Sequence, residues 1–326
     1  MFVDAGYLLA SAATRVSGSS LRGGIKVHYE QLIAAMTAQA EEIAGLPLLR
    51  INWYDAAKNA LPDKDQERIG ALSRVKVRLG RVGFGGEQKG VDLRIGLDMV
   101  AQARNGAVDV ILLVSGDDDL TEAVEEAQVH GVQVKVLAVP DKTGGPHGVS
   151  EHLLRASDGI ELLAPESLDR TVLRVVGRPA AAPPVPLPGP LPGPRPAPAP
   201  RKPGPVPGPP PAYLPAPKFA ESTLAYQSET GSPPSFAPEY ADALADGRLV
   251  EAINEVVRGV IDSFLASATE EERGEVLRAK PSIRSDLDRA LLLDLAHRTE
   301  DHDLSDQIRY QLREHFWEAL ADSKAG

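Results

Sequence analysis

The stretch from Leu112 to Gly131, "LLVSGDDDLTEAVEEAQVHG", places three consecutive aspartates between an apolar run and an amphipathic segment. The apolar run predicts a strand over residues 108–115 that is buried on both faces. The segment after the aspartates has helical spacing and predicts a helix over residues 120–130. A strand that leads directly into a helix is typical of a parallel sheet.

The same alternation continues on both sides of this stretch. Strands are expected at residues 1–4, 48–54, 75–79, 108–115, 132–139 and 160–163, and helices at 7–16, 29–44, 65–73, 91–104, 120–130 and 149–156. Short β-rich runs separated by helical patterns predict an α/β fold with a mostly parallel sheet covered on both faces. In such folds ligands bind beyond the carboxyl ends of the strands.

The remaining sequence divides into two parts with different compositions. From Pro179 proline stands at nearly every second position as far as about Pro217. Proline removes amide donors, so residues 179–235 are expected to be an extended linker, which can also present a ligand to a proline-recognising domain. Residues 236–326 have apolar residues at three-to-four spacing and predict a small all-α module, with Phe264, Leu291, Leu295, Phe316 and Trp317 in its core. The expected domains are therefore 1–178, 179–235 and 236–326.

Composition excludes several classes of protein. The net charge of −11 disfavours binding of nucleic acid through bulk positive potential, and residues 236–326 carry most of the acidity, with 11 Lys and Arg against 20 Asp and Glu. The absence of cysteine excludes disulfides and thiolate metal sites and suits a reducing cytoplasm. No signal peptide or membrane span is expected, and the Ala, Arg, Pro and Gly bias is typical of high-GC bacteria. P-loop, dinucleotide-binding and Ser-His-Asp patterns do not occur.

Two interpretations compete for the aspartates at 117–119. In the structural one they cap the following helix and favour its positive end. In the functional one they join acids from elsewhere: Asp4 ends the first predicted strand, and Asp92 lies in the first turn of the helix expected at 91–104. If the first strand and the strand before these aspartates are both central and parallel, their terminal carboxylates meet at one edge of the sheet.

Carboxylates gathered in this way repel one another unless a cation is present. Oxygen ligands without His or Cys favour a hard metal, Mg²⁺ or Mn²⁺. Such an ion stabilises the charge that develops when a phosphodiester is cleaved, so the pattern indicates hydrolysis of a phosphate ester, with nucleic acid as the expected substrate.

The order of "FVDAG", "KGVDLRIGLDM" and "VSGDDDLTEAVEEAQVHGVQVKV" resembles the NYN domain of the PIN-like nuclease superfamily, in its LabA-like bacterial branch, over about residues 1–163. The resemblance implies a parallel-sheet α/β/α sandwich and a ribonuclease that depends on Mg²⁺ or Mn²⁺. Matched by motif, the catalytic and metal-binding residues are Asp4, Asp92, Asp117 and Asp119. Asp98 matches a further acid, and Asp118 falls at the variable position, so both are accessory candidates together with Ser115.

Two features depart from the family pattern. Many members have Asn three residues after the first acid, whereas this chain has Tyr7, which cannot supply an amide. The chain also begins only three residues before Asp4, so the first strand is short or the true start lies upstream. A short strand is expected to weaken the positioning of Asp4.

A basic strand follows at "RVKVRLGRV", where Arg74, Lys76 and Arg78 share one face. With Arg81, Lys89 and Arg94, Arg78 is a candidate contact for the RNA backbone, although charge protection of an edge strand explains the same pattern. Phe84, in a glycine-rich loop, is a weaker candidate for stacking on a base.

The leading hypothesis is a cytoplasmic, metal-dependent endoribonuclease, with protein partners at the helical module or the Pro-rich linker. The alternative is a degenerate NYN domain that acts as an RNA- or protein-binding scaffold. A phosphotransferase of the haloacid dehalogenase type is disfavoured because "DAGYL" lacks a second Asp two residues after the first.

Overall fold

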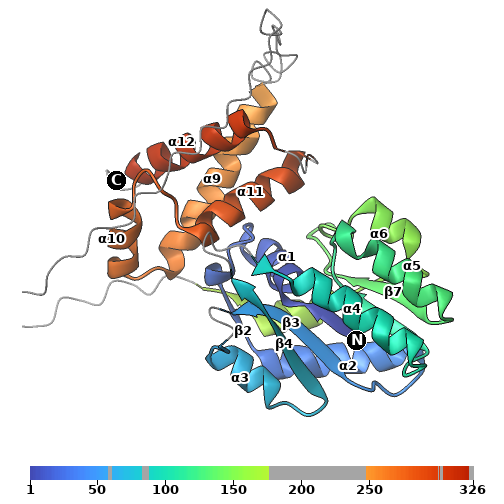
Figure 1. Cartoon of the computed structure of the whole chain (residues 1–326). Helices are drawn as coiled ribbons and strands as arrows, with labels where there is room; N and C mark the ends of the chain where they lie inside the picture. Colours follow the sequence, from blue (N-terminus) through green and yellow to red (C-terminus); the bar gives the residue numbers. More distant parts are fainter. Residues whose placement is uncertain (58–60, 83–87, 176–246, 300, 302–303, 323–326) are drawn as a thin grey trace, which may run out of the picture. The chain divides into compact units, whose positions relative to one another are not determined.

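The computed structural model describes residues 1–57, 61–82, 88–175, 247–299, 301 and 304–322 (Figure 1). The predicted linker at 179–235 and the glycine-rich loop around Phe84 lie outside the described residues. Among the described helices, none combines the length and apolar character needed to span a membrane.

A seven-stranded sheet with strand order β5-β4-β3-β1-β6-β7-β8 forms the centre of the N-terminal domain. Its strands are β1 (Phe2–Asp4), β3 (Ile51–Ala57), β4 (Val75–Val82), β5 (Gln88–Lys89), β6 (Val110–Val114), β7 (Gln133–Ala138) and β8 (Gly159–Leu162). Six of them pair in parallel, and the short β5 pairs antiparallel with the end of β4. The predicted α/β class with a parallel sheet is confirmed.

The three-residue strand β1 lies in the middle of this sheet. It pairs with β3 on one side, where Asp4 is in register with Tyr54, and with β6 on the other, where Val3 is in register with Val114. Phe2 and Val3 are fully buried. The expectation that a short first strand would hold Asp4 weakly is therefore wrong, because backbone pairing on both sides compensates for its length.

Helices cover both faces of the sheet, as predicted. One face carries α1 (Ala5–Ser17), α2 (Tyr29–Ala44), α3 (Lys64–Gly70) and α7 (Pro165–Thr171), and the other carries α4 (Val91–Arg104), α5 (Thr121–Val129) and α6 (Glu151–Ala156) (Figure 1). Alternate strand residues supply the two cores: Val3 and Trp53 face α1 and α2, whereas Phe2 and Tyr54 face α4. This architecture is an α/β/α sandwich.

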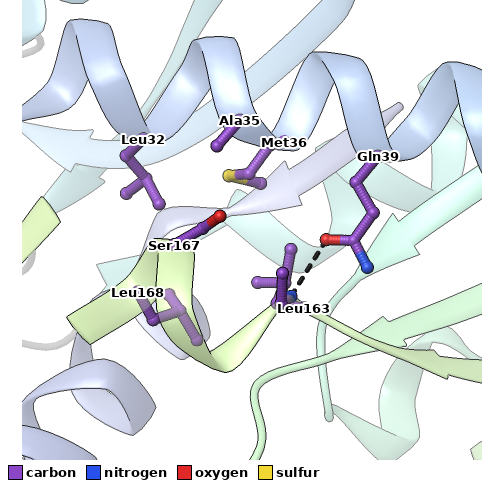
Figure 2. A pocket seen from close by; sticks show the side chains of 8 residues that line it. Leu32, Ala35, Met36, Gln39, Leu163, Ser167 and Leu168 are labelled. Carbon is purple, nitrogen blue, oxygen red and sulfur yellow. Dashed lines mark hydrogen bonds between the residues drawn. The ribbon is translucent and has the colours of Figure 1, made fainter. Parts of the chain in front are cut away.

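Four short elements were not predicted because each is too short to show a periodic pattern. Besides β5 they are α7 and the strands β2 (Ile25–Val27) and β9 (Val172–Arg174), which pair antiparallel as a separate ribbon. Gln39 of α2 holds the chain between β8 and α7, since its side-chain amide group donates to the Leu162 carbonyl. Its side-chain oxygen accepts from the Ala164 amide, the hydrogen bond drawn in Figure 2. The void beside it is about 10 Å³, no larger than one water molecule needs.

The C-terminal region is helical, with α9 (Gly247–Ser267), α10 (Glu270–Arg278), α11 (Ser285–Thr299) and α12 (Asp306–Asp322). All five residues predicted to form its core are buried. The apolar cluster of these helices also includes Leu21, which precedes β2 and is 3% exposed, and this region groups with the N-terminal domain in one compact unit. The division into separate domains at 178 and 236 stays a prediction.

Candidate active site

Acidic residues gather where the central strands end. Asp4 is the last residue of β1, and the neighbouring strand β6 is followed by a 3-10 turn, η3 (Asp118–Leu120), which carries Asp119 and is capped by Asp117. Asp92 lies in the first turn of α4, which packs against both β1 and η3. The carboxyl edge of the sheet thus carries acids from three distant segments of the chain.

Local backbone requirements explain why each acid stands at a turn. Asp4 caps α1, since its Oδ1 accepts a hydrogen bond of 2.7 Å from the Gly6 amide. Asp117 caps η3 in the same way, with 3.1 Å from the Asp119 amide to its Oδ1. Both acids are therefore held in fixed orientations, and capping and a functional role are compatible.

The carboxylates at this edge act electrostatically on one another. Burial, and secondly the negative charge of Asp92, raise the pKa of Asp4 to about 6. Burial raises the pKa of Asp92 too, with further contributions from Asp117 and Asp119. The pKa of Asp117 is also raised, first by burial and then by the charges of Asp119 and Asp118. The arrangement concentrates negative charge in a poorly solvated place.

Ser115 and Gly116 directly follow β6, and Ser115 contacts Asp4 at the end of β1. The Ser115 hydroxyl is fully buried, lies 3.4 Å from Oδ2 of Asp4 as a donor and accepts from the Asp117 amide at 3.3 Å. A Cβ on Gly116 would stand 1.8 Å from the carbonyl oxygen of Gly148, so only glycine allows the two backbones to approach. Ser115 is thus a positioning residue between two of the acids.

The donor set fits a hard divalent cation in its chemistry, because it consists of carboxylate oxygens whose mutual repulsion a cation relieves. Within the described part of the chain, however, no group of three or more His, Asp or Glu side chains is already arranged as a metal-binding group. The carboxylates therefore match a divalent cation in donor type and charge, but the described side chains are not arranged around one common metal position.

Two accessory candidates, Asp118 and Asp98, form hydrogen bonds or ion pairs with residues outside the acidic cluster. Asp118 accepts a hydrogen bond of 2.6 Å from Ser150 and lies 3.3 Å from His152, both at the start of α6. Asp98 accepts from the hydroxyl of Tyr54 at 2.9 Å and pairs with Arg78. Each of these carboxylates has a local structural partner.

Tyr7, which replaces the Asn common in the family, has a structural role. Its hydroxyl donates to the carbonyl of His147 at 2.8 Å and accepts from the amide of Val139 at 3.2 Å. Burial raises the pKa of its phenol, so the group stays neutral. Tyr7 ties α1 to the segment after β7.

The predicted RNA contacts do not form one free basic surface. Arg78 is paired with Asp98 at 3.4 Å, and the guanidinium of Arg94 donates to the carbonyl of Leu79 at 2.9 Å. Arg81 and Lys89 are in register where β4 meets β5, and their side chains lie outside the described part of the structure.

Two residues near the cluster are not among the predicted site residues. Asp55, 9% exposed, lies towards the carboxyl end of β3, and its Oδ2 accepts from Gln66 of α3. Arg22, in the turn η1 (Arg22–Gly24), lies 3.6 Å from Asp55, and its charge lowers the pKa of Asp4, although less than burial raises it. The signal that indicates Asp4, an acid near the end of an apolar strand, applies to Asp55 as well. Arg22 has no such signal, because it follows an irregular segment.

Comparison with known proteins gives one family and one relative. The family model of the NYN domain matches residues 1–163. Uncharacterized protein y4oD of Sinorhizobium fredii (strain NBRC 101917 / NGR234) is 39% identical over 80 residues, which cover 24% of this chain and 37% of that protein. No solved structure matches the chain. With half of its length matched and with the α/β sandwich and acidic edge described above, the chain belongs to the NYN domain family of PIN-like nucleases.

Proposed function

We propose that this protein is a metal-dependent endoribonuclease. The observation that carries the proposal is the placement of Asp4, Asp92 and Asp117 at the carboxyl edge of the sheet, where burial and neighbouring carboxylates raise all three pKa values. Acids with raised pKa values at the carboxyl edge of a nuclease-type fold are typical of a catalytic centre.

In this proposal Asp4, Asp92, Asp117 and Asp119 hold Mg²⁺ or Mn²⁺. The ion supplies electrostatic stabilisation of the charge that develops on the phosphodiester. Ser115 keeps Asp4 and the backbone of Asp117 in place through the two hydrogen bonds of its hydroxyl. RNA as the substrate and the cytoplasm as the location belong to the same proposal, as does a protein partner at the helical region.

Replacement of Asp117 by Asn tests this function. Asn keeps the cap on η3 but removes the charge, so D117N is expected to fold normally and to lose Mn²⁺-dependent RNA cleavage by at least about 100-fold. The matched control is D109N, because Asp109 is exposed and lies just before β6, at the opposite end of the same strand. Cleavage of labelled RNA, with and without EDTA, is the measurement. Undiminished Mn²⁺-dependent cleavage by D117N would remove the proposed mechanism.

A second candidate function is a degenerate NYN domain that binds RNA or a protein without cleaving RNA. It is favoured by the side chains that are not closed around a shared ion and by the commitment of Tyr7 to a structural role. The same experiment separates the two functions. A wild-type protein that binds RNA but leaves it intact at millimolar Mn²⁺ would support the scaffold.

A further inference from the structure

A pocket of about 440 Å³ lies on the face of the sheet that carries α2 and α3. Side chains from η1, β2, α2 and α3 line it, among them Arg22, Lys26, Tyr29 and Arg68. Ligand pockets in proteins have volumes of roughly 300–1,000 Å³, so the space is sufficient for a nucleotide unit. Apolar side chains such as Leu9 form other parts of its wall.

The charged side chains that line this pocket are mostly cationic. Three of its residues are basic, and Asp65 is its one acidic residue among those described. Arg68 is partly neutralised by Glu30 at 3.2 Å and Asp65 at 3.7 Å. Lys26 is exposed, and among the described residues no carboxylate lies within ion-pair distance of its ammonium group. The pocket therefore has an uncompensated positive charge at Lys26.

Arg22 connects the pocket with the acidic edge. Arg22 lines the pocket, and its guanidinium lies 3.6 Å from Oδ1 of Asp55, on the strand next to β1. Its positive charge also acts on Asp4. An anion in the pocket would thus lie one side chain away from the acidic cluster.

The basic face of β4 is a second, weaker candidate for the surface that contacts RNA phosphates. Lys76 lies two residues before Arg78 and shares its face, which is directed towards Asp98 of α4. Arg78 is engaged in that ion pair, and Arg94 donates to a backbone carbonyl. On this face Arg78 and Arg94 already have partners, whereas Lys26 lines a pocket.

We propose that the pocket between η1, β2, α2 and α3 binds the sugar-phosphate backbone of single-stranded RNA beside the acidic cluster, with Lys26 and Arg22 as its phosphate contacts. The inference rests on the proposed function, because it identifies where the substrate of that function is held. It assigns single-stranded RNA, since the pocket has the volume for one nucleotide unit and its basic residues match the charge of one backbone phosphodiester.

The test uses the full-length protein and a labelled ten-nucleotide oligouridylate. Binding is measured by fluorescence anisotropy in EDTA, so that no cleavage occurs, at several salt concentrations. Each phosphate contact to a single strand contributes about 0.7 to the slope of log K against log[salt]. K26A is expected to lose about fivefold in affinity at 0.1 M salt and about 0.7 in slope, and K26R to restore both.

K76A is the matched control, because it removes an exposed lysine of β4 on the face of the seven-stranded sheet that lies opposite to the pocket. It is expected to bind as the wild type does. Equal losses in K26A and K76A, or no binding by the wild type, would overturn the pocket as the RNA site.

Cleavage of the same RNA with Mn²⁺ distinguishes this inference from the proposed function. K26A is expected to raise KM about fivefold and to leave kcat unchanged. If Lys26 affects binding but the wild type cleaves no RNA, the pocket stands and the nuclease function fails. If the wild type cleaves RNA and K26A behaves as K76A does, the nuclease function stands and the pocket fails.

Discussion

Asp4 combines several constraints in one side chain. It ends the central strand, caps α1 and is 7% exposed. Burial and the charge of Asp92 raise its pKa to about 6, so at neutral pH the metal-free protein holds an ionised carboxylate where ionisation is unfavourable. The ionised carboxylate of Asp4 therefore reduces stability when no cation is bound.

This gives a pH dependence for the metal-free protein. Since the folded protein binds the Asp4 proton more tightly than the unfolded chain does, stability conferred by the protonated form is complete below about pH 4 and is lost as the pH rises through about 6. D4N, which keeps the cap but cannot ionise, is expected to avoid this loss. Relative to the wild type in EDTA, its free energy of unfolding should rise by about 2–3 kcal/mol between pH 4 and pH 7. Urea denaturation at a series of pH values measures the difference, and a constant difference would contradict it.

The turn between β6 and η3 determines how the acids after β6 are presented. Gly116 lies between Ser115, which contacts Asp4, and Asp117, which caps η3. Its carbonyl accepts from the Ser150 amide, and its Cα faces the carbonyl of Gly148. The position of the acids at 117–119 thus depends on close contact with a second loop.

A methyl group at this position is expected to separate the two loops. G116A should lower the free energy of unfolding by about 2–3 kcal/mol, because its Cβ would overlap a backbone oxygen that has no rotamer to change. G159A is the matched control, since nothing lies within 4 Å of a Cβ built at Gly159 in β8. Chemical denaturation of both variants measures their free energies of unfolding. Equal values for G116A and G159A would contradict the prediction, because they would show that the two loops separate at little cost.

At the scale of the whole molecule, the helical region and the N-terminal domain share an apolar cluster. Leu21 comes from the segment between α1 and β2, yet it is buried with residues of α9, α11 and α12. The net charge of the C-terminal part is strongly negative, so contact with RNA phosphates there is unfavourable. Its apolar contact favours a role in supporting the N-terminal domain.

L21A tests this coupling. Removal of a buried leucine side chain is expected to lower the free energy of unfolding by about 2–4 kcal/mol. L97A is the control, because Leu97 of α4 is 63% exposed and its loss should change stability by less than about 0.5 kcal/mol. If L21A were as stable as L97A, the two parts would be independent domains, as the division at 178 and 236 predicts.

Periodicity and composition alone were enough for the α/β class, the six parallel strands and the helices α2 and α4, whose ends agree with the pattern to the residue. The pattern also placed Asp4 and the acids at 117–119 after apolar strands, and Asp92 in the first turn of a helix. Their assignment as catalytic and metal-binding residues follows from the resemblance to the NYN domain and stays a prediction. Contacts between distant segments decided the features that periodicity does not contain. Strand pairing on both sides makes three residues sufficient for β1. Asp98 bonds to Tyr54, Asp118 bonds to Ser150, and Arg22 lies beside Asp55. The physical reason is that a side chain's partners depend on which segments pack together, and segments such as η1, β2 and β9 are too short to carry a periodic signal of their own.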